Sequence, residues 1–171
     1  LGPVISEQLK KKLPSSKIIA LDTFWYLETK LEDNKAFDGI IFKDKRDLEI
    51  SDFDGFDIVI DLAAVSNDPM GKDFSKPTLE INGSSTIKLA KKCRLAGVKK
   101  FIFASSCSIY GAAGDAPRIE NDPKNPLTEY ALSKWNAEQG LIKIADEKMS
   151  IISLRQDLLL HVVGVRILEL I

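Results

Sequence analysis

Tyr130 and Lys134 lie four residues apart in a stretch whose pattern predicts a helix. Side chains at positions i and i+4 share one helical face, one turn apart. An ammonium held near a phenol stabilises the phenolate, and a tyrosine that ionises near neutral pH can act as a general acid or base. The pair alone does not establish an active site, because the same spacing occurs by chance on solvated helix faces.

Strand and helix patterns alternate along the chain and must position this pair. Short apolar runs predict strands at 17–21, 37–42, 57–62, 100–104 and 151–154. Helical patterns cover 2–13, 76–96 and the stretch from Tyr130 to about Glu147, and Gly97 is expected to close the second of them. Residues 24–35 fit either a loop or a short helix. This alternation predicts βαβ units, a mainly parallel sheet and helices on both of its faces. Ligands bind such sheets at the carboxyl ends of the strands.

Asp22 comes directly after the first predicted strand. An acid at this point of a dinucleotide-binding fold accepts hydrogen bonds from the adenosine ribose hydroxyls. The residues after it, Thr23, Phe24 and Trp25, supply no cation for a 2′-phosphate, which favours NAD over NADP. A turn-forming or helix-capping aspartate explains the same position equally well.

Small and polar residues also follow three other predicted strands. Asp44 and Lys45 fit either the edge of an adenine pocket or a plain charged turn. Ala63 and Ala64 would let a flat cofactor approach a strand end closely, although core packing explains them too. Ser106 lies 24 residues before the tyrosine, where its hydroxyl could bond the same substrate oxygen. The alternative for this residue is an ordinary loop serine.

The overall composition argues against several classes of function. The 171 residues fit one domain, and a net charge of −1 with interspersed signs speaks against nucleic-acid or anionic-membrane partners. No apolar run is long enough to span a bilayer, and the N-terminus has no signal-peptide pattern, so we expect a cytoplasmic protein. Cys93 and Cys107 are too few for a disulfide framework, and a single histidine, His161, completes neither a metal cluster nor a triad. We therefore expect no metal site.

The segment 101–111, followed by the motif at 130–134, resembles the extended short-chain dehydrogenase/reductase family. Residues 57–64 are similar to the strand-four signature of that family, and Asn82-Gly83 matches the helix that follows. Within the family the likeness is greatest to NAD-dependent nucleotide-sugar epimerases and dehydratases. The resemblance implies an α/β fold with a Rossmann-type doubly wound parallel sheet, whose NAD-binding domain covers 1–156.

The resemblance also implies roles for individual residues. Tyr130 would be the catalytic acid/base, Lys134 its activator, and Ser106 the group that polarises the reacting hydroxyl. Asn82 would be structural or would support the active-site network. The residues implied to bind NAD, which include the catalytic tyrosine and lysine, are Gly2, Asp22, Asp44, Lys45, Leu62, Ala63, Ala64, Asn82, Ser105, Tyr130 and Lys134.

Two departures from the family pattern affect the expected fold. The family joins its first strand to its first helix by a TGxxGxxG turn, and only Gly2 matches here, as the last glycine. We therefore expect a sheet lacking its first strand, although those glycines normally let backbone N–H groups approach the pyrophosphate. Residues 157–171 are strongly apolar and do not match the substrate domain. We interpret them as an apolar tail or as a fragment of the substrate domain. We therefore expect a fold that lacks most of that domain.

A third departure narrows the reaction. Sugar 4,6-dehydratases of the family usually carry an Asp-Glu pair after the catalytic serine, where this chain has Cys107-Ser108. Neither side chain readily performs the acid and base steps of water elimination. We expect NAD-dependent epimerisation of a nucleotide-sugar through a transient keto-sugar. The alternatives are an NAD-dependent reductase or dehydrogenase of a sugar or small alcohol, and a non-catalytic nucleotide-binding Rossmann protein.

Family members often dimerise through the tyrosine-bearing helix, so a homodimer is possible. Apolar residues along this helix permit such a contact, but core packing explains the same stripe; they are Leu132, Trp135, Leu141, Ile142 and Ala145. Beyond a nucleotide-sugar substrate and the cofactor, the sequence supports no other partner, and it does not identify the sugar.

Overall fold

All strand pairings in the computed structural model are parallel, among the residues that it describes: 2–23, 37–65, 73–112 and 117–156. One sheet pairs β1 with β2, and the other has the order β3-β4-β5. The strands are β1 Ile19–Asp22, β2 Gly39–Phe42, β3 Ile58–Asp61, β4 Lys100–Ser106 and β5 Ser150–Gln156. The predicted parallel α/β architecture is confirmed.

The two sheets together reproduce part of the doubly wound strand order 3-2-1-4-5-6. β2 and β1 correspond to strands 3 and 2 of that order, and β3, β4 and β5 correspond to strands 4, 5 and 6. Among the described residues, no strand joins β1 to β3, where strand 1 would lie. This split agrees with the predicted Rossmann-type sheet that lacks its first strand.

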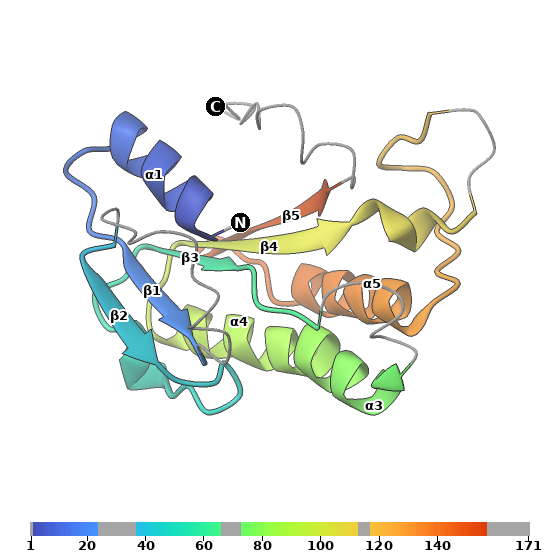
Figure 1. Cartoon of the computed structure of the whole chain (residues 1–171), viewed down its shortest axis with the longest axis horizontal. Helices are drawn as coiled ribbons and strands as arrows, with labels where there is room; N and C mark the ends of the chain where they lie inside the picture. Colours follow the sequence, from blue (N-terminus) through green and yellow to red (C-terminus); the bar gives the residue numbers. More distant parts are fainter. Residues whose placement is uncertain (1, 24–36, 66–72, 113–116, 157–171) are drawn as a thin grey trace.

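Helices cover both sides of the strands. Figure 1 shows α4 and α5 below β4 and α1 on the opposite side. The longer helices are α1 Gly2–Lys12, α4 Ser85–Leu95 and α5 Glu129–Ile142. The shorter ones are the 3₁₀-helices η2 Ile50–Phe53 and η4 Cys107–Tyr110, α3 Ser75–Thr78 and the π-helix η3 Leu79–Ser84. None of the helices in the described ranges is long and apolar enough to cross a membrane.

The main core lies between β4 and the helices α4 and α5. Phe101 and Phe103 alternate along β4 and are buried on the same face of the sheet. They belong to one apolar cluster with residues of both helices and of the turns that follow them: Leu89, Ala90, Cys93, Val98, Ala137, Leu141, Ile144 and Met149. This packing holds α5, and so the Tyr130–Lys134 pair, against β4.

Some predicted boundaries are wrong, and tertiary contacts explain the differences. Ser105 and Ser106, predicted to lie in a loop, are strand residues that pair in register with Arg155 and Gln156 of the longer β5. The helix predicted to reach residue 147 ends at residue 142. The Asp146 carboxylate accepts backbone hydrogen bonds from residues 148 and 149, which turns the chain into β5.

The helix predicted at 76–96 is present, but it is not regular. It consists of α3, the π-helix η3 and α4, and Gly97 follows it at φ +86°, a backbone conformation that favours glycine. The Gly97 N–H donates to Arg94 O at 3.2 Å, which supports the predicted helix stop. The ambiguous segment 24–35, His161 and the tail 157–171 lie outside the described residues.

Candidate active site

The N-terminus of α5 places Tyr130 and Lys134 beside the end of β4. Thr128 caps the helix, since its Oγ1 accepts a hydrogen bond from the Ala131 N–H at 3.1 Å. Lys134 is 3% exposed, and its Nζ donates to Ala104 O of β4 at 2.6 Å. The same Nζ lies 5.7 Å from the centroid of the Tyr130 ring. The predicted juxtaposition of phenol and ammonium is therefore present.

Burial changes the acidity of this lysine. Because the ammonium has been removed from water, the pKa of Lys134 falls from 10.5 to about 8, with the Asp61 carboxylate opposing the fall and the Lys45 cation adding to it. The Phe103 ring centroid lies 4.7 Å from Nζ, so an aromatic face partly replaces the lost hydration. Near neutral pH the group keeps its positive charge in a site where water screens it weakly.

Ser106 is the last residue of β4, at the carboxyl end of a strand as predicted. Its Oγ accepts hydrogen bonds from the Ser108 backbone N–H at 3.2 Å and from the Ser108 hydroxyl at 2.9 Å. Ser106 therefore caps η4, which fixes its side chain at this end of the strand. The predicted catalytic trio is thus carried by the β4 end and by the first two turns of α5.

Ser105, predicted to contact NAD, points instead into a buried polar network. Its hydroxyl donates to the carboxylate of Glu138 on α5. Glu138 is also paired with Arg155 of β5, at 2.7 Å between Oε2 and an Nη atom. Arg155 reaches the Tyr110 hydroxyl at 2.7 Å, and hydrogen bonding to Glu138 raises the pKa of its guanidinium. The network ties α5 to β4 and β5, and neither Glu138 nor Arg155 is among the predicted site residues.

The loop after β3 presents small residues at the sheet edge. Ala63 is exposed, which excludes core packing as its explanation, while Leu62 and Ala64 are half-buried. Asn82 is fully buried in η3, and its side-chain amide both accepts from Val65 N at 2.8 Å and donates to Val65 O at 2.9 Å. The π-helix turns Asn82 toward the loop, which supports the structural role predicted for it.

Gly2 and Asp22, which the resemblance implies bind NAD, lie at the start of a helix and at the end of a strand. Gly2 begins α1, and a methyl group added to it would meet no atom of the described residues within 4 Å. Asp22 is the exposed last residue of β1 and accepts a hydrogen bond from the Thr23 hydroxyl at 3.3 Å. Exposed Ala63 lies in the loop after β3 of the other sheet, two residues beyond the end of that strand. An open helix N-terminus, an exposed strand-end acid and a small loop residue fit the phosphates, ribose and flat face of a dinucleotide.

Asp44 and Lys45 are placed differently from a simple adenine edge. The Asp44 carboxylate accepts hydrogen bonds from Arg46, including Nε at 3.0 Å, which holds its pKa below the usual value. Lys45 is 8% exposed, and its ammonium points into the interior, 2.8 Å from the Asp61 carboxylate. Its charged end therefore faces the core, and any contact with an adenine is left to its backbone or aliphatic stem.

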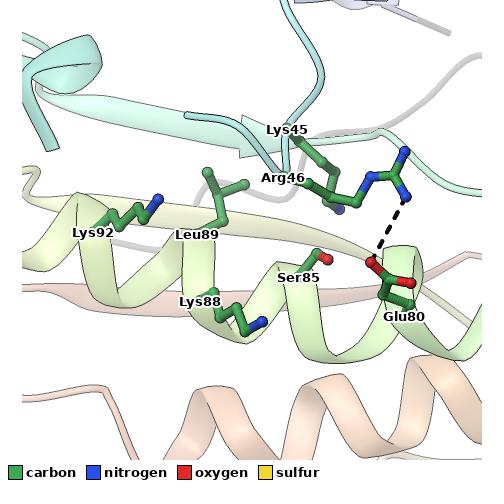
Figure 2. Close-up of a pocket in the computed structure, with 7 residues that line it drawn as sticks. All are labelled: Lys45, Arg46, Glu80, Ser85, Lys88, Leu89 and Lys92. Carbon is green, nitrogen blue, oxygen red and sulfur yellow. Dashed lines mark ion pairs between the residues drawn. The ribbon is translucent and has the colours of Figure 1, made fainter. Parts of the chain in front are cut away.

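A small cavity lies between the turn after β2 and helix α4 (Figure 2). Its volume is about 70 Å³, and it is lined by Lys45, Arg46, Glu80, Ser85, Lys88, Leu89 and Lys92. This volume is far below the several hundred Å³ of ordinary cofactor pockets. Arg46 is also paired with Asp44 at 2.8 Å and lies 3.7 Å from Glu80. Within the described ranges, no cluster of His, Cys, Asp and Glu could hold a metal ion.

Comparisons with curated proteins point to sugar epimerases. One relative is the N-acetyl-alpha-D-glucosaminyl-diphospho-ditrans,octacis-undecaprenol 4-epimerase of Escherichia coli O157:H7. It is 38% identical over 89 residues, which cover 51% of this chain and 25% of the relative. UDP-glucose 4-epimerase 4 of Oryza sativa subsp. japonica is 32% identical over 127 residues, covering 71% and 34%. The chain thus spans about a quarter to a third of these relatives.

Solved structures show the same fold over most of the chain. MoeE5 in complex with UDP-glucuronic acid and NAD superposes with a TM-score of 0.77 at 26% identity, covering 90% of this chain and 50% of that one. UDP-glucuronic acid 4-epimerase from Bacillus cereus in complex with NAD gives a TM-score of 0.72 at 25% identity, covering 90% and 51%. Residues 1–166 match the family described as the NAD dependent epimerase/dehydratase family. The chain belongs to this family, the nucleotide-sugar branch of the extended short-chain dehydrogenases/reductases.

Proposed function

We propose that the protein epimerises a nucleotide-sugar with NAD as its cofactor, and that Tyr130 is the acid/base. The observation that carries this proposal is the buried Lys134 ammonium, 5.7 Å from the centroid of the Tyr130 ring. A cation in a poorly hydrated position stabilises a phenolate more strongly than it would in water. Stabilisation of the Tyr130 phenolate by the Lys134 ammonium is therefore part of the proposal.

Each catalytic side chain has a task in this scheme. The Tyr130 phenolate takes the proton of a sugar hydroxyl while that carbon is oxidised, and it returns the proton when the ketone is reduced from the opposite face. Ser106, fixed by its cap on η4, donates a hydrogen bond to the reacting oxygen. Lys134 holds the phenolate and the ribose of the cofactor. The Ala104 carbonyl keeps this lysine in place.

The cofactor would be held along the carboxyl ends of β1 and β3. Asp22 would accept the adenosine ribose hydroxyls, the α1 N-terminus at Gly2 would face the pyrophosphate, and Ala63 would allow close approach. When bound, NAD supplies the acceptor and donor of the hydride in the transient oxidation. The acid at Asp22, with Thr23 after it, favours NAD over the phosphorylated cofactor. Both of the superposed structures are complexes with NAD, which supports this assignment.

Epimerisation is favoured over dehydration by the residues after Ser106. Cys107 and Ser108 replace the acid and base of a dehydratase, and the Ser108 hydroxyl is already bonded to Ser106. The curated relatives are named as 4-epimerases, which makes UDP-glucose and UDP-galactose the first substrates to try.

A homodimer through α5 stays a prediction. Leu132 and Ile142 remain 39% and 67% exposed on that helix, while Leu141 lies in the core.

The test uses full-length protein and UDP-galactose deuterated at C4. An epimerase converts it to UDP-glucose that keeps the deuterium at C4, without net formation of NADH, because the same hydride returns to the other face. Tyr130→Phe should abolish this conversion while NAD stays bound and the fold stays intact. If the variant kept most of its activity, the assignment of the acid/base would be wrong.

Other outcomes would replace the proposal by one of its alternatives. Accumulation of NADH with transfer of deuterium to free cofactor would identify a dehydrogenase. Bound NAD without turnover of UDP-, GDP-, CDP- or dTDP-sugars would leave a non-catalytic nucleotide-binding protein.

A further inference from the structure

We propose that Lys45 is a positioning residue for the cofactor: through a buried cluster with Asp61 and Thr86 it fixes the Ala63 backbone beside the cofactor site. This inference rests on the proposed function, since it assigns a purpose to the loop that would approach NAD. Lys45 itself would not touch the reacting atoms. The cluster joins the turn after β2, the end of β3 and helix α4.

The contacts of the cluster are short, and its three side chains are buried. The Lys45 ammonium lies 3.1 and 2.8 Å from the two carboxylate oxygens of Asp61, 2.9 Å from the Thr86 hydroxyl and 3.1 Å from Ala63 O. The Thr86 hydroxyl donates its own proton to Asp61 at 2.9 Å. Lys45, Asp61 and Thr86 are 8%, 5% and 0% exposed.

The ammonium has three protons, and the cluster uses all of them. One goes to the carboxylate of Asp61, one to the Thr86 hydroxyl and one to the Ala63 carbonyl. A charged donor makes a stronger hydrogen bond than a neutral one, so the carbonyl is held firmly. The charge of Lys45 is balanced by Asp61, which allows both groups to be buried.

The cluster lies between the two sheets, so its hydrogen bond to Ala63 links them. β2 belongs to one sheet and β3 to the other, and within the described chain no strand ladder joins them. Lys45 bridges that division by reaching from the turn after β2 to the end of β3. Val65 lies two residues beyond Ala63, and the Asn82 side chain forms hydrogen bonds with both its backbone N–H and its carbonyl oxygen. The loop is thus held at two points, while Ala63 itself stays exposed.

A purely structural role is the competing explanation, and substitution can separate the two. Replacing a buried ion pair by apolar residues of similar size often leaves stability unchanged or improves it. The double variant Lys45→Met, Asp61→Leu therefore keeps the core filled but removes the donor to the Ala63 carbonyl. The matched control exchanges the exposed pair of Lys99 and Asp57, which is 73% and 70% exposed, by the same types of residue.

The experiment measures three quantities on the full-length protein: the urea midpoint, amide hydrogen exchange at residues 63–65, and the dissociation constant of NAD. In the Lys45→Met, Asp61→Leu variant we expect an unchanged midpoint, with amide exchange and the NAD dissociation constant each raised about tenfold. The Lys99→Met, Asp57→Leu control should match the wild type in exchange and in NAD binding. If the Leu variant does not fold, Lys45→Met, Asp61→Asn keeps a polar partner for Thr86 and tests the same loss.

Failure of this inference differs from failure of the proposed function. Wild-type exchange and NAD binding in a folded double variant would show that the cluster only fills the core. A wild-type protein that binds no NAD would overturn the proposed function, and with it the cofactor part of the inference. Unchanged exchange at 63–65 in the double variant would overturn the anchoring part whether NAD binds or not.

Discussion

The buried ammonium of Lys134 should make protein stability depend on pH in a way that can be calculated. Its pKa is about 8 in the folded protein, because burial disfavours the charged form, against 10.5 for an exposed lysine. Between these two pH values the unfolded chain binds more protons than the folded chain. The free energy of unfolding therefore rises with pH across this window. At lower pH the folded protein must keep the charge buried, which costs stability.

The size of the effect follows from the two pKa values. The interval from about 8 to 10.5, at roughly 1.36 kcal/mol for each pKa unit, corresponds to about 3 kcal/mol in the free energy of unfolding. Cys93 acts in the opposite direction, because burial raises the pKa of its thiol from 9.0 to about 12. Its ionisation in the unfolded chain lowers stability above pH 9. A comparison of variants that all keep Cys93 removes this contribution.

The assay is urea unfolding at several pH values from 7.5 to 10.5 for wild-type protein and Lys134→Met. Methionine keeps most of the side-chain volume and cannot ionise. Relative to wild type, the variant should lose about 3 kcal/mol of stability as the pH rises through the window. Lys88→Met, at an exposed position on α4, serves as the control and should show no such change. Parallel pH curves for wild type and Lys134→Met would refute the reasoning, because the Lys134 ammonium would then be hydrated in the folded protein.

The remaining predictions concern cofactor binding, backbone strain and the buried ion pair. Asp22→Ala should raise the NAD dissociation constant about tenfold without changing the melting temperature, and an unchanged constant would return Asp22 to a turn role. Gly111→Ala should destabilise the protein by at least ~2 kcal/mol, since φ is +73° and the new methyl would lie 2.2 Å from a backbone oxygen. Gly55→Ala, with φ +78° and no atom of the described residues within 4 Å of the new methyl, should cost only about 1 kcal/mol in urea unfolding. Equal losses of stability in the two variants would contradict the clash at Gly111. Glu138→Leu should cost about 3 kcal/mol, because it removes the buried carboxylate that pairs with Arg155, and a near-neutral result would mean that this network is solvated.

Local patterns in the sequence were sufficient for the architecture. Apolar runs predicted all five strands of the described residues, and their alternation with helices predicted parallel pairing. The i, i+4 spacing placed Tyr130 and Lys134 on one face of α5 because a regular helix fixes that relation. Gly97 marked a helix end because its positive φ is a local property of the backbone.

What the sequence did not reveal depends on partners that are distant along the chain. Lys45 lies in a run of charges that fits an exposed turn, and only Asp61, 16 residues later, makes its burial tolerable. Ser105 has the composition of a loop residue but joins β4 because β5 supplies a partner. The π-helix around Asn82 cannot be inferred from periodicity, because it forms where the side chain meets the Val65 backbone.

The most direct test of the central claim is to purify the full-length protein, denature it and identify any released cofactor by mass spectrometry. The proposed cycle regenerates its cofactor within each turnover, so the account predicts close to one NAD for each chain. A protein that releases none and also fails to bind NAD in titration would contradict the assignment of Asp22, Tyr130 and Lys134 to an NAD-dependent epimerase.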